Sequence, residues 1–311
     1  MKQSFLLPLS SIFFALILFT SCKKSDSEKE APLTSAQIAA HTDDESLVSA
    51  ETDAAMGDAN IVLESEDTFS GDFLVVAKRV CDADLVIDTA SNPMTITINY
   101  NGEGCTASRT RTGTVIISTA KATKWKMAGA VVSVRFQDLT ITRVSDHKKI
   151  KLNGTHTYTN VTGGLLYSLS AQDSIVQTIS SDNMSVSVDS TVARSWKIAK
   201  KRTYVYDNGI VLRITGAHTE GSLSNIAEWG TNRFDKKFTT TISSPLVFKQ
   251  SCGFRLGAGT VAHVTGGFSA TATFGLDITG LATVCPGEGH YYYKLLWSGP
   301  DGVPSSVILP Y

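Results

Sequence analysis

The sequence predicts an all-β protein built on large antiparallel sheets, of the sandwich or curved-sheet type. Three observations predict this fold class. Thr, Ser, Gly and Val are abundant in the chain, a bias that favours strands and turns over helices. From about Phe69 onward apolar and polar residues alternate with a period of two, as in a strand with one face in water. Turn dipeptides such as Asn101-Gly102 and Asn208-Gly209 separate these runs.

The clearest strands lie in a β-rich body that we place at residues 71–311. In each strand apolar side chains take every second position, with mostly Thr, Ser or Asn between them. These runs cover residues 94–100, 132–136, 184–188 and 270–274. The alternation stops between residues 189 and 194, which leaves open a division into two β modules near residue 190.

The N-terminus, residues 1–21, has the pattern of a lipoprotein signal peptide. Lys2 precedes an apolar run at residues 5–19, which is shorter than the roughly 20 residues of a bilayer-spanning helix. The run ends in Phe19-Thr20-Ser21-Cys22, which resembles the lipobox of bacterial lipoproteins. We therefore expect Cys22 to be acylated and to anchor the chain in a lipid membrane, since two or more acyl chains hold firmly. An uncleaved anchor and an ordinary secretory signal are the alternatives.

An acidic segment, residues 22–70, follows the signal peptide. Residues 23–70 hold 3 Lys and 12 Asp or Glu, a net of −9, whereas residues 71–311 hold 24 Lys or Arg and 17 acids, a net of +7. Short helical turns are compatible with residues 35–40 and 46–51, with Ser35 and Asp44 as caps. A disordered acidic tether is an equally good interpretation.

Basic residues of the body form four groups along the sequence. Such groups attract anionic partners such as lipid head groups or acidic glycans, although solvated strand faces are the commoner interpretation. Export makes nucleic acid the least suitable partner. The groups are Lys121/Lys124/Lys126, Arg143/Lys148/Lys149/Lys151, Arg194/Lys197/Lys200/Lys201/Arg202 and Arg233/Lys236/Lys237.

Four cysteines remain once Cys22 is acylated, and outside the cytoplasm an even number predicts disulfides. Of three connectivities we favour Cys81–Cys105 and Cys252–Cys285, each stabilising by about 3 kcal/mol in the chain-entropy model. The cysteines have no paired spacing of a structural zinc site.

The body resembles a group of uncharacterised, β-rich lipoproteins of Bacteroidetes type. In that group a Thr/Ile strand runs into a turn with Gly and Cys, then into an Arg/Thr/Gly strand; here these are residues 95–100, Gly102 to Cys105, and residues 109–113. The resemblance covers most of residues 75–297. It implies an envelope location and a β fold, and it implies no activity.

The sequence contains no motif of a catalytic, cofactor or metal site, and we expect none of these. The six histidines, His41, His147, His156, His218, His263 and His290, lack metal-ligand spacing, so we expect each on the surface or in a strand. Asp82, Asp84 and Asp88 share strand parity and could offer oxygens to Ca²⁺, although acids that line a solvated strand face are the commoner interpretation. The carboxylates that a glycosidase would need are Glu103, Glu220, Glu228, Asp235 and Glu288. The aromatics that could stack on sugars, or more simply fill a core, are Trp125, Trp196, Trp229, Trp297 and the Tyr291-Tyr292-Tyr293 run.

These observations favour a non-enzymatic lipoprotein of the cell envelope, held at the outer membrane on its surface or periplasmic face. Its β body would bind, adhere or scaffold. Two alternatives are a lipid or lipoprotein carrier, which requires an apolar cavity, and a carbohydrate-active hydrolase, which requires converging carboxylates.

Overall fold

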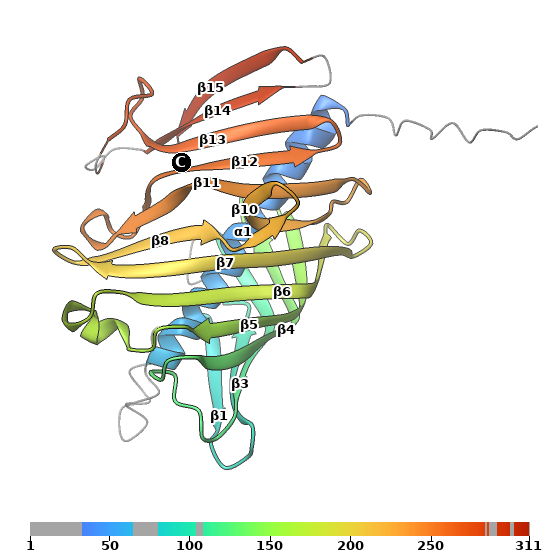
Figure 1. Cartoon of the computed structure of the whole chain (residues 1–311). Coiled ribbons are helices and arrows are strands. Elements are labelled where there is room, and N and C mark those ends of the chain that lie inside the picture. The colour runs from blue at the N-terminus through green and yellow to red at the C-terminus, as the bar shows by residue number, and fades with distance from the viewer. Residues whose placement is uncertain are drawn as a thin grey trace, which may run out of the picture. The chain divides into compact units, whose positions relative to one another are not determined.

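The computed structural model describes residues 33–64, 80–103, 108–283, 285, 291–298 and 302–310. Within these residues fifteen strands form one antiparallel sheet, and one α-helix, α1 (Ser35–Glu64), crosses the strands (Figure 1). The predicted all-β fold class is confirmed. The strands are β1 (Ala83–Asp88), β2 (Met94–Asn101), β3 (Arg109–Thr119), β4 (Ala130–Arg143), β5 (Lys149–Asn160), β6 (Ile175–Val188), β7 (Arg194–Tyr206), β8 (Ile210–Gly216), β9 (His218–Glu220), β10 (Leu223–Thr231), β11 (Lys237–Lys249), β12 (Leu256–Thr265), β13 (Phe268–Leu276), β14 (Tyr292–Ser298) and β15 (Pro304–Pro310); the short 3-10 helices are η2 (Leu166–Ala171) and η3 (Gln250–Cys252).

The strand order follows the chain except at one place. β1 to β7 are consecutive neighbours, as are β10 to β15. Between β7 and β11 the sheet holds two short strands, β8 and β10. Each of them pairs with both β7 and β11, but over different residues of these two neighbours. The break expected near residue 190 is a turn between β6 and β7, which pair with each other. The sheet therefore continues through this point.

A row of irregular positions crosses β3 to β6 and bends these strands. The register shifts beside Gly113 in β3, beside Asp138 in β4, beside Gly154 in β5 and before Met184 in β6. Such bulges increase local twist and re-aim side chains. Gly113 has φ +100, and a Cβ there would lie 2.3 Å from the carbonyl oxygen of Asp138, so only glycine allows the two strands to approach.

Helix α1 differs from the expectation of short, separate turns, because its 30 residues are continuous. Thr34 rather than Ser35 caps it: the backbone N–H of Gln37 donates to the Thr34 hydroxyl, and the backbone N–H of Thr34 donates to the Gln37 side chain. This reciprocal pair is a capping box. Asp44, expected as a cap, lies inside the helix and is buried.

The main core lies between α1 and the face of β2 to β7. Val48, Met56, Val62 and Leu63 of the helix belong to the same cluster as the inward side chains of these strands. Because side chains of α1 are buried in the same core as those of the strands, the helix is part of the folded body and not a loose tether. None of the helices in the described residues is both long and apolar enough to span a bilayer.

Candidate functional site

Many charged side chains of the molecule meet where α1 contacts the sheet. The helix carries seven acidic residues and no Lys or Arg, and six of the seven acids pair with basic side chains of the sheet and its loops. The pairs are Asp43–Arg143 (2.7 Å), Asp43–Lys148 (2.6 Å), Asp44–Lys148, Asp44–Arg233 (2.8 Å), Glu45–His263 (2.9 Å), Glu51–Arg109 (3.1 Å), Asp53–Lys200 (3.0 Å), Asp53–Arg202 (3.2 Å) and Asp58–Arg111 (2.8 Å).

These pairs show why the N-terminal segment and the body carry opposite net charges: acids of the one bind bases of the other. We expected the basic groups to be solvated strand faces, and that interpretation is wrong for Lys148, Lys200 and Arg202, which are buried against α1. Burying a charge is costly unless it is paired. The acidic helix and the basic face therefore neutralise each other.

Lys200 is the centre of one saturated network. Its ammonium donates to Asp53 (3.0 Å) and pairs with Glu228 (2.8 Å). The second oxygen of Glu228 accepts a hydrogen bond from the indole of Trp196 at 2.8 Å. Although burial disfavours the charged ammonium, Asp53 and Glu228 outweigh it, so the pKa of Lys200 lies above its ordinary value. With its partners in place, this network stabilises the fold and offers no free acid or base.

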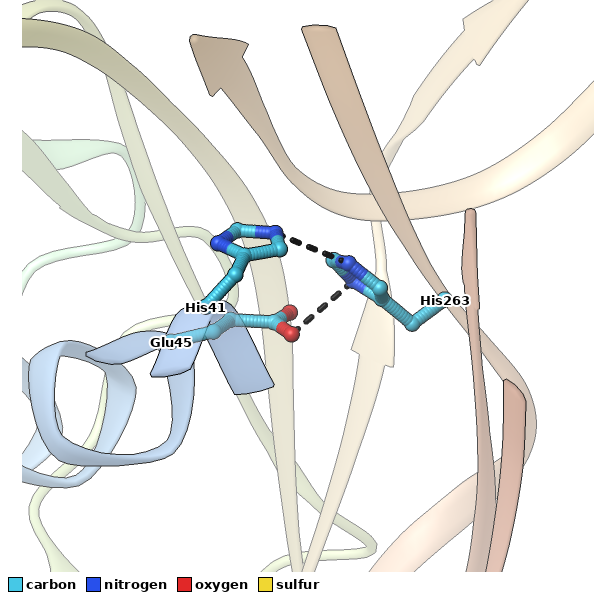
Figure 2. A group of neighbouring side chains, drawn as sticks. All are labelled: His41, Glu45 and His263. Carbon is cyan, nitrogen blue, oxygen red and sulfur yellow. Dashed lines mark hydrogen bonds and ion pairs between the residues drawn. The ribbon is translucent and has the colours of Figure 1, made fainter. Parts of the chain in front are cut away.

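A second cluster, the His41–Glu45–His263 triad, joins the first turns of α1 to β12 (Figure 2). His41 and Glu45 lie one helical turn apart and so share a face of α1. Their side chains meet His263 near the end of β12. The Nε2 atoms of the two histidines are 3.0 Å apart, and a carboxylate oxygen of Glu45 is 2.9 Å from Nδ1 of His263.

The surroundings of the triad are closed and partly apolar. His41 is 1% exposed and His263 is 7% exposed. The ring of Phe238 in β11 packs 5.3 Å from the His41 ring and 5.9 Å from the His263 ring, between centroids. Thr240, the cross-strand neighbour of His263, contacts both His263 Nδ1 (2.9 Å) and Glu45.

The protonation state of the triad follows from these contacts. Burial and then the neighbouring His263 lower the pKa of His41 to about 4. Burial opposes ionisation of Glu45, but His263 and Thr240 outweigh it, so the Glu45 pKa lies below its usual value. An ionised Glu45 accepts a hydrogen bond from Nδ1–H of His263, and when His263 is neutral this leaves its Nε2 lone pair facing His41.

This arrangement can hold either a proton or a metal ion between the two rings. Two imidazoles and a carboxylate, with one ligand atom from each within 4.8 Å of the others, match the donors that divalent transition metals prefer. A small cavity lined by His41, Trp196, Asn232 and Arg233 lies beside the triad. We expected each histidine on the surface or in a strand; His263 does lie in β12, whereas His41 is buried on α1, so the expectation is wrong for His41.

The other candidate residues do not converge. Asp82 binds Arg111 through both oxygens, Asp84 is exposed, and Asp88 accepts hydrogen bonds from its own turn, so they form no calcium site. Glu228 is paired as described, Asp235 pairs with Arg194, and Glu103 and Glu220 are exposed. Glu288 lies outside the described residues. Trp125, Trp196 and Tyr291 are buried, and Trp229 stacks on His218, whereas Tyr293 and Trp297 are partly exposed.

The cysteines agree with the favoured pairing where the structure describes them. Cys252 after β11 and Cys285 form a disulfide, with Cα atoms 5.6 Å apart. Cys81 is disulfide-bonded, while Cys105 and Cys22 lie outside the described residues.

Sequence reasoning missed the triad for a simple reason. The spacing of His41 and Glu45 is a usable signal once a helix is assumed, because positions i and i+4 share a face. His263 lies 222 residues away in the sequence, and nothing in its surroundings distinguishes it from other strand residues.

Comparison of the chain with models of protein families, with curated proteins and with solved structures finds no match.

Proposed function

We propose that this chain is a lipid-anchored protein of the bacterial cell envelope, whose β body binds or scaffolds other envelope components and catalyses no reaction. The observation that supports this proposal best is the position of α1. Leu33, buried at the start of the described chain, comes eleven positions after Cys22. Six acids of the following helix are paired to the sheet. An acyl anchor at Cys22 would therefore be joined to the packed core by only a short stretch of chain.

The resemblance to envelope lipoproteins and the lipobox-like Phe19-Thr20-Ser21-Cys22 support the same location. The state of two carboxylates that a hydrolase could use also favours binding over catalysis. Glu228 and Asp235 are both engaged in ion pairs with basic side chains.

The anchor is tested by expressing the full-length chain, with a small C-terminal tag, in a bacterium that processes lipoproteins. We expect labelled palmitate to enter the wild-type chain and to be lost in Cys22→Ser, which would leave the membrane fraction. Cys252→Ser serves as the matched control and should keep the label. Equal labelling of wild type and Cys22→Ser would disprove the anchor.

Protease treatment of intact and lysed cells then places the body on the surface or in the periplasm. Loss from intact cells indicates the surface. The non-enzymatic part of the proposal fails if the purified wild-type chain turns over any member of a glycan and peptide panel.

A second candidate function is a lipid or lipoprotein carrier. Phe274 and Tyr293 lie 5.6 Å apart between ring centroids, and the strand register puts Leu295 and Trp297 on the same partly exposed face. The packed contact of α1 with β2 to β7 argues against an apolar cavity there. If the chain is a carrier, lipid should co-purify with the wild type and be reduced in Trp297→Gln.

A further inference from the structure

The two imidazoles of the triad face each other in a way that ordinary core packing does not require. Both present Nε2 to the other at 3.0 Å, and both are buried. We propose that His41 and His263 bind a divalent transition metal ion of the Zn²⁺ class through their Nε2 atoms, with Glu45 as the carboxylate that positions His263.

The separation of the two nitrogen atoms suits such an ion. Zn²⁺ binds imidazole nitrogen at about 2.0–2.1 Å in tetrahedral geometry, which puts two ligating nitrogens roughly 3.3 Å apart. The observed 3.0 Å requires the rings to separate by only a few tenths of an ångström. His41 sits on a helix and His263 on a strand, so a small shift of α1 against β12 provides this movement.

Glu45 fixes the orientation that metal binding requires. Its carboxylate accepts from Nδ1–H of His263 at 2.9 Å, and Thr240 holds the same two groups from β11. With the proton on Nδ1, the Nε2 lone pair of His263 is free for a metal. Carboxylates commonly hold metal-binding histidines in this way and increase their basicity.

The competing explanation is a hydrogen bond between the two rings with no metal. It requires His41 to donate through Nε2–H to the Nε2 lone pair of His263, whereas Nδ1 of His41 has no hydrogen-bond partner among the described residues with or without a metal. In the metal-bound form the proton of His41 moves to Nδ1 and the ring stays neutral. We expect water from the small cavity that His41 lines with Asn232 and Arg233 to complete the coordination.

A metal at this position would join α1 to the sheet close to where the helix begins. The ion would bridge residues that are 222 positions apart and would reinforce the ion pairs of Asp43 and Asp44 on the next positions of the helix. Metal binding would therefore stabilise the seating of α1, since a ligand that binds only the folded state favours that state.

The test uses the full chain without a histidine tag, stripped with a chelator and titrated with Co²⁺ and Zn²⁺. We expect one Co²⁺ per chain with the visible absorption bands of a tetrahedral site, displacement of Co²⁺ by Zn²⁺, and a higher Tm with Zn²⁺. Excess Mg²⁺ and Ca²⁺, which prefer oxygen ligands, should not compete.

Variants locate the site. His41→Phe and His263→Gln should each abolish the Co²⁺ bands and the Zn²⁺ effect on Tm. Glu45→Gln keeps both ligands and should weaken affinity by roughly 10–100-fold while the bands persist at saturating Co²⁺. His218→Gln, which removes a histidine stacked on Trp229 away from the triad, is the matched control and should bind as the wild type does.

The Tm of each variant in chelator shows whether it is folded, and a variant that does not fold is replaced by His41→Gln or His263→Leu. The proposal is overturned if the wild type binds no metal in this titration. It is equally overturned if the folded His41 and His263 variants bind as tightly as the wild type.

Discussion

At the residue scale, His156 in β5 shows how a polar side chain can lie in the core without partners. It is fully buried, and neither ring nitrogen has a hydrogen-bond partner among the described residues. The ring of Phe136 packs edge-on at 4.8 Å between centroids. Burial, followed by the charge of Lys200, lowers the pKa of His156 to about 3, so the ring is neutral in the folded protein at physiological pH.

Replacing this ring with an apolar side chain should stabilise the protein. We expect His156→Leu to raise the free energy of unfolding by about 1–3 kcal/mol at pH 7, because an unsatisfied buried polar group costs this much. Urea denaturation measures the change. His218→Leu, whose ring is only partly buried, is the control and should change stability much less. A loss of stability in His156→Leu would show that the imidazole has a partner that the contacts do not reveal.

The same variant should also reduce acid sensitivity. The folded-state pKa of His156, about 3, is below the unfolded value of about 6.5, so the unfolded chain binds the extra proton and stability falls as pH drops below about 6.5. Between pH 7 and pH 5 this effect costs the wild type about 2 kcal/mol. The advantage of His156→Leu over the wild type should grow by that amount over the same range.

At the element scale, the strands were predictable, whereas the sequence indicated only short helical turns and not the continuous helix α1. The alternating runs at 94–100, 132–136, 184–188 and 270–274 fall in β2, β4, β6 and β13, because an antiparallel sheet with one wet face imposes a period of two. Helix α1 has no such signature. Its buried side includes Asp44, Glu51 and Asn60 together with Val48 and Met56, so its sequence has no apolar stripe and resembles a solvated tether.

The candidate site was hidden for the same reason. The helix is stabilised by cations that lie a hundred or more residues away, such as Arg143 for Asp43 and Lys200 for Asp53. A local pattern cannot contain such partners. The opposite net charges of the linker and the body were visible in the sequence, and in retrospect they indicated that the two segments bind each other.

The ion pairs of α1 should therefore contribute more than surface pairs do. We expect Asp53→Asn to destabilise the protein by about 2–3 kcal/mol, because the buried Arg202 loses its carboxylate partner and Lys200 keeps only Glu228. Asp235→Asn, which breaks a pair whose acid is 70% exposed, should cost at most about 1 kcal/mol. Denaturant unfolding of both variants makes the comparison, and equal effects would show that α1 is only loosely seated.

At the scale of the whole molecule, packing is uneven along the sheet. The large core cluster joins α1 to β1 through β7 and Phe238, whereas no residue of β13, β14 or β15 belongs to any of the three core clusters in the described part of the chain. β15 is an edge strand, and Val307 and Leu309 on it are 36% and 37% exposed. Local stability follows the amount of buried apolar surface, so the two ends of the sheet should differ.

Hydrogen exchange of the native protein should reveal this gradient. We expect the amides of α1 from Val48 to Leu63 to exchange as slowly as those of β4 and β5, because the helix and these strands share one core and can open only together. The amides of β14 and β15 should exchange much earlier. Since an acidic tether would exchange within the dead time, slow exchange in α1 separates a docked helix from a solvated one more directly than any change in Tm. Fast exchange throughout α1, with β4 and β5 protected, would mean that the sheet folds without its helix, and the neutralisation of basic strand residues by α1 would then have to be abandoned.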